Sequence, residues 1–431
     1  MTIPRRHWTE ELEIIDELMK SVSDLTDPEE MVGIYWDGVH KLFPMEHYLA
    51  VSRRGIDPPE FLITRSSRFA EHFNPWKERH RLPRMSGGLL GEIAYADKPL
   101  VIDDLPSRLR PDDPAHFYLE GYQSLIAMPN YEGGKGINVG MSLFAPGVDF
   151  DRSMVPMMHW QSSLFGRGTQ NLVLRNQLTE ALGALDRELQ TVGQIQRSLL
   201  PTELPSIPGF EIATDYQTSA RAGGDYYDFF PLGDRGWGVF IADVSGHGTP
   251  AAVLMAVTHA IAHTRPGDPQ PPAEVLAHIN HHLTRSYTNS GTFVTAFYAA
   301  IAPSSRRVTY SSAGHNPPRL VRGERVIALD ENASLPLGIM QDTRFADGAV
   351  DLEPGDLLVL YTDGYTEAMA PRAADGSREL FGERRLDRLL IDAGDAPAQE
   401  IVERIVRETN EFSRGESATD DRTLIVLRYR G

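Results

Sequence analysis

Residues 223–255 constrain the fold and the chemistry of this chain more than any other stretch. They combine two predicted strands, a short loop between them and the start of a helix, and an aspartate stands at one end of each strand, at Asp225 and Asp243. The second strand begins at Trp237 and is almost continuously apolar, which indicates that both of its faces are buried. A carboxylate at the end of a buried strand is costly to desolvate unless it is paired. Two such aspartates would repel each other, and a divalent cation between them would relieve the repulsion.

Two further aspartate sites follow the same pattern. The apolar segment 357–362 ends at Asp363, and Asp420 and Asp421 come directly before the last predicted strand. The chain contains no cysteine, and none of these sites offers a pair of histidines. Ligation by oxygen alone favours Mg²⁺ or Mn²⁺ over Zn²⁺ or copper. Several carboxylates could hold two such ions roughly 3.5–4 Å apart, an arrangement that stabilises the attacking and leaving oxygens of an in-line phosphoryl displacement.

Six short motifs follow one another along the second half of the chain. They are Gly223-Gly-Asp-Tyr-Tyr-Asp, Asp243-Val-Ser-Gly-His-Gly, Ala313-Gly-His-Asn-Pro-Pro, Pro336-Leu-Gly-Ile, Tyr361-Thr-Asp-Gly-Tyr-Thr-Glu and Asp420-Asp-Arg-Thr. In this order they resemble the PPM (PP2C-like) phosphatases of the SpoIIE/RsbU type over about residues 194–430. The resemblance implies a phosphatase domain over residues 202–431, built as an α-β-β-α sandwich with the metal site at one end.

The resemblance also implies roles for single residues. Asp225, Asp243, Asp363 and Asp420 match the catalytic and metal-binding carboxylates. Asp243 would bridge two Mn²⁺ or Mg²⁺ ions, and the backbone carbonyl of Val244 would add another oxygen ligand. Asp225 would hold the second ion, and Asp363 and Asp420 the first. The implied reaction is hydrolysis of phosphoserine or phosphothreonine by an activated water, without a covalent enzyme intermediate.

Several neighbouring residues have other interpretations. Asp421 and Asp228 are interpreted as structural or supporting residues, and Arg221 is a candidate for holding the substrate phosphate. Ser245 and His247 could form a nucleophilic triad with an aspartate. The Gly-x-Ser-x-Gly pattern of such sites is absent, however, because an aspartate precedes Ser245 by two positions. We therefore expect His247 and also His315 to shape the site or to form local hydrogen bonds.

The composition bounds the class of protein. A length of 431 residues implies two or three domains, and the absence of cysteine excludes disulfides and thiolate metal sites. A net charge of −18 argues against general nucleic-acid binding. Neither a signal peptide nor an apolar run long enough to span a bilayer is recognisable, so the expectation is a cytoplasmic protein without membrane contact.

The first part of the chain mixes predicted helices over 8–25 and 28–42 with short strands over 46–165. Gly87-Gly-Leu-Leu-Gly-Glu-Ile-Ala, Lys98-Pro-Leu-Val-Ile-Asp-Asp and Leu125-Ile-Ala-Met-Pro resemble the middle of a GAF domain. The resemblance implies a GAF-like sensor over residues 1–172 that receives a small-molecule or protein signal. The aromatic residues of this part could line a ligand pocket, although core packing is their more frequent role; they are Trp36, Trp76, Trp160 and Tyr118.

Residues 173–201 are predicted to form a helical coiled-coil linker. Apolar residues recur at alternating spacings of four and three, with one polar position at Gln196; the seam is Leu178, Leu182, Leu185, Leu189, Val192, Gln196 and Leu199. Together with the resemblance, the pattern favours a parallel homodimer. The alternative is a single amphipathic helix packed against its own domain.

These observations predict an α+β protein with a sensor, a linker and a phosphatase domain. The predicted function is a sensor-regulated, metal-dependent serine/threonine phosphatase. Its substrate, implied by the resemblance, is a signalling phosphoprotein, an anti-sigma-factor antagonist. One alternative is a catalytically silent scaffold that binds a signalling partner, but all four ligand positions are filled. A kinase of the histidine-kinase type is disfavoured, because neither Asp243 nor Asp363 begins an Asp-x-Gly-x-Gly sequence.

Overall fold

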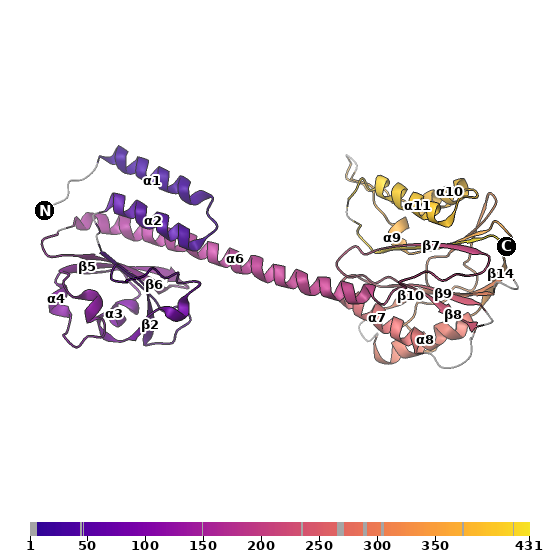
Figure 1. Ribbon diagram of the computed structural model, residues 1–431, viewed down its shortest axis with the longest axis horizontal. Helices are drawn as coiled ribbons and strands as arrows, with labels where there is room; N and C mark the ends of the chain where they lie inside the picture. Colours follow the sequence, from indigo (N-terminus) through magenta and orange to yellow (C-terminus); the bar gives the residue numbers. More distant parts are fainter. Residues whose placement is uncertain are drawn as a thin grey trace. The chain divides into compact units, whose positions relative to one another are not determined.

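The computed structural model divides into two compact units, Met1–Gly183 and Ala184–Gly431 (Figure 1). The long helix α6 (Val155–Arg197) contributes to both units. No helix within the described parts of the chain is both long and apolar enough to cross a bilayer. The structure describes residues 7–43, 45, 47–148, 150–233, 236–264, 271–287, 291–302, 306–372, 375–416 and 418–431.

The first unit is built on a six-stranded antiparallel sheet with the strand order β3-β2-β1-β6-β5-β4. Its strands are β1 (His47–Ser52), β2 (Glu60–Ser66), β3 (Arg84–Ser86), β4 (Leu100–Ile102), β5 (Ser124–Glu132) and β6 (Lys135–Phe144). Its other helices are α1 (Trp8–Ser23), α2 (Pro28–Leu42), α3 (Gly88–Ala94), α4 (Leu105–Arg108) and α5 (His116–Leu119), with the 3-10 turns η1 (Arg79–Arg81) and η2 (Arg152–Met154).

Local signals explain the first helices of this unit. The helices predicted over 8–25 and 28–42 are confirmed as α1 and α2. Asp27 begins α2 because its carboxylate accepts the backbone N–H groups of Glu29 and Glu30, which have no partner inside the helix.

One face of the sheet packs on α3, α4 and α5, and the other lies beneath α2 and α6. The two faces therefore have separate cores.

The second unit contains two five-stranded sheets, β14-β11-β10-β9-β8 and β13-β12-β15-β16-β7. The strands are β7 (Phe210–Gln217), β8 (Tyr226–Pro231), β9 (Trp237–Val244), β10 (Val294–Ala302), β11 (Arg307–Ala313), β12 (Arg319–Arg322), β13 (Arg325–Ala328), β14 (Gly348–Asp351), β15 (Leu357–Tyr361) and β16 (Arg422–Tyr429). The helices are α7 (Thr249–His263), α8 (Pro272–Ser286), α9 (Asp363–Thr366), α10 (Glu383–Asp392) and α11 (Ala398–Phe412).

The two sheets of this unit pack face to face between outer helices. Helices α7 and α8 cover the first sheet, and α10 and α11 cover the second (Figure 1). Strand β15 shows how the layers form: Leu358 and Leu360 enter the core between the sheets, while Val359 faces α10 and α11. Strand β9 is buried along most of its length, as its continuous apolar pattern predicted. The unit thus has the layer order helix, sheet, sheet, helix.

The end of α6 differs from the rest of the predicted heptad seam. Leu178, Leu182 and Leu185 are 61%, 57% and 52% exposed, whereas Gln196 is only 3% exposed. Gln196 packs within the second unit and contacts the segment that precedes β8. The predicted heptad seam therefore does not run without interruption from Leu178 to Gln196. Gln196, the polar position of that seam, already has a partner within the chain.

Candidate metal centre

Four strand ends supply the predicted carboxylates. Asp225 directly precedes β8. Asp243 is the second-to-last residue of β9 and lies opposite Thr295 of β10. Asp363 starts α9 just after β15, and Asp420 lies two residues before β16. Strands β8 and β9 belong to one sheet and β15 and β16 to the other, so residues from both sheets contribute to the candidate centre.

Asp225 connects the two sheets. It is 1% exposed, and its Oδ2 accepts hydrogen bonds from the hydroxyls of Thr362 and Thr423, at 2.8 and 2.6 Å. Both threonines come from the opposite sheet, at the end of β15 and in β16. Burial raises the pKa of Asp225 well above its usual value, and the nearby carboxylate of Asp243 raises it further. The two hydroxyls fix this carboxylate without supplying a compensating charge.

The other three carboxylates also repel one another. Burial raises the pKa of Asp243 to about 7, and the carboxylates of Asp363 and Asp420 add to the shift. Burial raises the pKa of Asp363 to about 6, with Asp420 as the next cause. Burial likewise raises the pKa of Asp420. The main groups that lower these pKa values are hydroxyls, backbone amides, His247 and, for Asp243, a side-chain hydrogen bond with Asp225; none of them is a lysine or arginine.

This arrangement fits divalent cations. The four aspartates predicted as ligands lie close enough to perturb one another, and their donor atoms are all carboxylate oxygens. Hard oxygen donors with excess negative charge are what Mg²⁺ and Mn²⁺ prefer. The carbonyl oxygen of Val244 lies close to Gly224, where a Cβ atom would come within 2.8 Å of it. Glycine at position 224 therefore allows the chain before Asp225 to approach the end of β9.

Asp421 holds the loop before β8 in place. It is 2% exposed, and its Oδ1 accepts the backbone N–H of Ser219 at 2.7 Å and the Ser219 hydroxyl at 3.1 Å. Its Oδ2 accepts the backbone N–H of Gly224 at 2.5 Å. A Cβ atom at Gly223 would come within 2.3 Å of this carboxylate. Asp421 therefore supports the position of Asp225, which agrees with its interpretation as a supporting residue.

Asp228 belongs to a separate buried network. Its carboxylate accepts hydrogen bonds from the Tyr226 hydroxyl at 2.6 Å and from the backbone N–H of Phe229 at 2.7 Å. It also lies 2.7 Å from Nε2 of His263, and His259 is close by on the same helix. These partners satisfy the carboxylate from several directions. Asp228 is thus a structural residue beneath α7.

Ser245 and His315 form hydrogen bonds with separate partners. The Ser245 hydroxyl oxygen accepts the backbone N–H of Phe293 at 2.9 Å, which ties it to the neighbouring chain segment. The buried His315 instead shares a hydrogen bond of 2.9 Å with the Thr295 hydroxyl. Burial lowers the pKa of His315 to about 4, so its ring is neutral at neutral pH. His315 therefore acts as a local structural group beside β10.

Arg221 contacts helix α6 instead of the four aspartates predicted as metal ligands. Its Nε donates to the Asp186 carboxylate at 2.9 Å. In the same region, Gln196 accepts the backbone N–H of Gly223 at 2.9 Å, and its amide nitrogen donates to the Gly223 carbonyl. A Cβ atom at Gly193 would lie 1.9 Å from the Arg221 carbonyl oxygen. The end of α6 is thus fitted closely against the loop that leads into Asp225.

Reasoning from sequence identified Asp421 as a supporting residue but missed the hydroxyl groups that hold Asp225. Thr362 and Thr423 lie inside the motifs that identify Asp363 and Asp420, but only the carboxylates suggested metal chemistry. The roles of Gly193 and Gln196 could not be read from the heptad pattern, because their partners lie in another segment. A glycine within a long amphipathic helix was the one available signal of a close approach.

Comparisons with known proteins find relatives of the second part of the chain. A family model described as stage II sporulation protein E (SpoIIE) matches residues 233–430. The phosphoserine phosphatase RsbU of Bacillus subtilis is 32% identical over 245 residues, which are 56% of this chain and 70% of that protein. Protein IcfG of Synechocystis sp. is 27% identical over 295 residues, which are 61% of this chain and only 45% of that protein.

A solved structure shows the same fold. The SiaA-PP2C domain of Pseudomonas aeruginosa superimposes with a TM-score of 0.52 at 23% identity, over 58% of this chain and 98% of that domain. The similarity to RsbU extends over most of that relative, and the layer order of the second unit is that of the PP2C-like domain. The chain therefore belongs to the SpoIIE/RsbU family of PPM-type (PP2C-like) protein serine/threonine phosphatases.

Proposed function

We propose that this chain is a metal-dependent phosphatase that hydrolyses phosphoserine or phosphothreonine on a signalling protein. The observation that carries the proposal is the group of four carboxylates at the strand ends of two sheets, whose pKa values burial and mutual repulsion raise. Such a group is unfavourable in the free protein and becomes favourable when cations bind. Family membership supports the same reaction class.

In the proposed mechanism, two Mn²⁺ or Mg²⁺ ions would be held by Asp225, Asp243, Asp363 and Asp420, and the carbonyl of Val244 would be a further ligand. The bound ions would acidify a water for in-line attack on phosphorus and neutralise the phosphoryl oxygens. The threonine hydroxyls keep the Asp225 carboxylate in one orientation. Residues that donate hydrogen bonds to a metal ligand commonly have this role. The buried setting of the carboxylates strengthens their attraction for cations.

The first test is phosphate release from a phosphoserine peptide with and without Mn²⁺. We expect release by the wild type to require the metal. The Asp243→Asn variant should lose more than about 100-fold in rate, since loss of partners one step from a metal already costs about 10–100-fold. The surface variant Asp351→Asn is the matched control, because this aspartate lies on β14 and is 73% exposed. Equal rates for wild type and Asp243→Asn would refute the proposed centre.

We propose a small anti-sigma-factor antagonist as the phosphoprotein substrate, on the basis of the resemblance to SpoIIE/RsbU phosphatases. A purified antagonist carrying one phosphoserine would then be dephosphorylated with a higher kcat/KM than a peptide of the same local sequence. A folded partner can contact surface around the centre, and a peptide cannot. Equal kcat/KM values for the two substrates would argue against recognition of the folded antagonist.

We further propose that residues 1–172 act as a GAF-like sensor and that residues 173–201 transmit its signal. The support lies in the last turns of α6. Gln196 binds both backbone groups of Gly223, and Asp186 pairs with Arg221, so α6 contacts the loop before Asp225 at two points. In this position α6 orders the loop and favours metal binding. Withdrawal of α6 would remove both contacts and weaken metal binding.

The regulatory proposal has a direct test in the full-length protein. We expect Gln196→Leu to weaken the apparent affinity for Mn²⁺, because the amide bonds that position Gly223 would be lost. A titration of phosphatase activity with Mn²⁺ measures the affinity. The exposed Gln399 of α11, which donates to Glu403 on the same helix, gives the matched control Gln399→Leu. An unchanged metal affinity in Gln196→Leu would rule out this route of regulation.

A further inference from the structure

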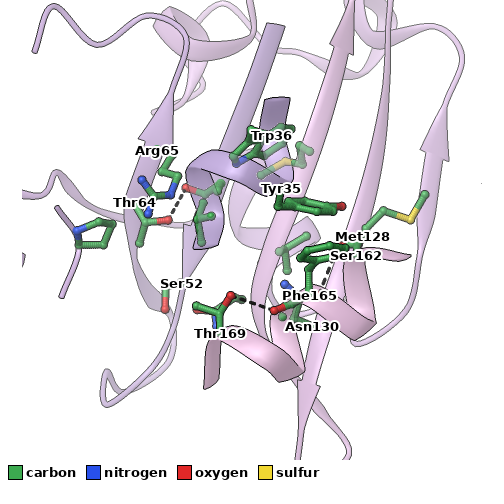
Figure 2. Close-up of a pocket in the computed structure, with 18 of the residues that line it drawn as sticks. Tyr35, Trp36, Ser52, Thr64, Arg65, Met128, Asn130, Ser162, Phe165 and Thr169 are labelled. Atoms are coloured by element: carbon green, nitrogen blue, oxygen red, sulfur yellow. Dashed lines mark hydrogen bonds between the residues drawn. The ribbon is translucent and has the colours of Figure 1, made fainter. Parts of the chain in front are cut away.

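The first unit contains a cavity of about 340 Å³ between its sheet and the helices α2 and α6 (Figure 2). Helix α2 contributes Tyr35 and Trp36 to its wall, and α6 contributes Phe165 and Thr169. A volume of this size is within the range of small-molecule sites in proteins. The cavity lies entirely in the first unit and is separate from the aspartate centre.

The cavity arises because the two faces of the sheet carry side chains of different size. Alternate residues of a strand point to opposite faces. The face toward α3 carries large apolar residues that fill a core, namely Leu49, Val51, Phe61, Ile63 and Leu143. The central part of the other face carries small or hydroxyl-bearing residues that line the cavity, namely Ala50, Ser52, Thr64, Gly140 and Ser142.

Gly140 shows the effect most clearly. It lies on β6 between Ala50 of β1 and Met128 of β5, near the middle of the sheet. A Cβ atom built on Gly140 would have no other heavy atom within 4 Å. A well-packed core of this size seldom leaves such a gap. The absence of side-chain volume at Gly140 and Ala50 therefore creates the space.

The wall combines flat apolar surface with a few polar groups. The rings of Tyr35 and Phe165 lie 4.4 Å apart between centroids (Figure 2). Asn130 accepts a hydrogen bond of 3.3 Å from Ser162, and its amide nitrogen has no acceptor among the residues that the structure describes. Aromatic walls with a small number of polar groups are typical of sites that bind an organic molecule in one orientation.

The charged groups of the cavity are all cationic. Arg54, Arg65 and Arg79 line it, and no aspartate or glutamate is found among its described lining residues. Glu29 neutralises Arg65 through two hydrogen bonds of 2.7 Å, and a carboxylate of Glu132 lies 2.8 Å from Arg54. Arg79 donates to the backbone carbonyl of Arg54, and no carboxylate pairs with it in the described part of the chain. Arg79 can therefore bind an additional anion.

We propose that this cavity binds a small organic anion with a flat aromatic body, of the aromatic carboxylate class. The body would lie against Tyr35, Trp36 and Phe165, over the small residues of the sheet. The carboxylate would pair with Arg79, next to the backbone of Arg54. Neither the family resemblance nor the proposed phosphatase reaction requires this ligand, so binding can be tested without any measurement of activity.

The test is isothermal titration calorimetry of the full-length protein with three probes of one shape. Indole-3-acetate is anionic, indole is neutral and tryptamine is cationic. We expect indole-3-acetate to bind most tightly, indole more weakly and tryptamine not at all. Loss of one charge-assisted hydrogen bond between the protein and the ligand should weaken binding by about tenfold. Arg79→Gln is therefore expected to lower the affinity for indole-3-acetate about tenfold and to leave that for indole unchanged.

Variants that fill the cavity provide the second part of the binding test. Gly140→Leu should abolish binding of indole-3-acetate, because the new side chain would occupy the space next to Met128. Gly33→Leu on α2 is the matched control, since Gly33 also has no neighbour within 4 Å but does not line the cavity. If Gly140→Leu does not fold, as judged by circular dichroism, Ala50→Leu replaces it.

Three results would overturn the proposal. Absence of binding by all three probes would exclude this ligand class. Unchanged binding of indole-3-acetate to a folded cavity-filling variant would place the probe elsewhere on the protein. Equal affinities for indole-3-acetate and tryptamine, with no effect of Arg79→Gln, would show that negative charge is not recognised.

Discussion

The buried carboxylate of Asp225 is held by hydroxyl groups that carry no charge. Asp225 receives its two side-chain hydrogen bonds from Thr362 and Thr423, which belong to the opposite sheet. A hydroxyl orients a carboxylate without neutralising it. The negative charge thus remains available to a cation, whereas an arginine in the same place would have competed with the metal.

Replacing Thr423 by valine should therefore weaken metal binding. Thr423→Val keeps the side-chain shape but leaves Asp225 with one hydroxyl partner, and we expect the apparent affinity for Mn²⁺ to fall by about 10–100-fold. Thr258→Val is the matched control, because Thr258 is fully buried and its hydroxyl donates to the backbone of α7. Metal titrations of both variants provide the measurement. Similar affinities for the two would contradict the role of Thr423.

His315 should make the stability of the second unit depend on pH. Burial lowers its pKa from the usual 6.5 to about 4. Between these values the unfolded chain binds a proton that the folded chain does not, so the free energy of unfolding falls as the pH falls. Over the whole window the loss is on the order of 3 kcal/mol, at about 1.4 kcal/mol per pKa unit.

Urea unfolding between pH 7 and pH 5 tests this prediction. The slope of stability against pH should be shallower in His315→Gln than in the wild type, because glutamine takes up no proton. Other titrating groups contribute equally to both proteins, so the difference between the slopes isolates His315. Parallel curves for the two proteins would mean that His315 does not remain neutral in the folded state.

At the scale of elements, the last turns of α6 and the loop before β8 are complementary in shape. Gly193 permits close approach to the backbone at Arg221, and Gln196 pairs with the backbone of Gly223. Each contact requires a particular residue type, a glycine in one case and an amide in the other. The helix is therefore positioned by specific contacts in addition to apolar packing.

Gly193→Ala should separate α6 from this loop. Alanine normally stabilises a helix interior relative to glycine by about 1 kcal/mol. At position 193, however, its Cβ would lie 1.9 Å from the Arg221 carbonyl oxygen, so we expect the thermal midpoint to fall and metal affinity to weaken. Gly33→Ala on α2, where a Cβ meets nothing within 4 Å, is the control and should be neutral or stabilising. A raised midpoint in Gly193→Ala would contradict the close fit.

At the scale of the whole molecule, α6 carries a row of exposed leucines. Leu174, Leu178, Leu182 and Leu185 are between 52% and 61% exposed and follow one another at spacings of four, four and three. Rows of this kind are typical of helices that pair with a second helix. We propose that two copies of the chain pair in parallel through this part of α6.

The proposed dimer gives the last prediction. We expect the wild type to sediment as a dimer and the double variant Leu178→Asp, Leu182→Asp to sediment as a monomer, since two charges would enter an apolar seam. Leu380→Asp is the control, because Leu380 is 45% exposed and is not part of α6. Sedimentation velocity at several concentrations separates these outcomes. A monomeric wild type at all concentrations would rule out the dimer.

Local patterns were sufficient to predict many elements and the principal carboxylates. The helices α1 and α2 follow from apolar periodicity and the Asp27 cap, and β9 follows from a continuous apolar run. The aspartates at strand ends stood out because a carboxylate there needs a partner. Each of these features depends on residues that are close together in the sequence.

The sequence by itself thus determined the order of the elements, the family and the residue types able to bind metal. Only the tertiary structure decided which side chains support them: Thr362 and Thr423 beneath Asp225, Gln196 against Gly223, and the small residues around Gly140 that leave a cavity. The physical reason is that hydrogen bonding and packing depend on distance in space. Residues from separate strands and helices come into contact only after the sheets have formed. The periodicity along the chain does not specify these contacts.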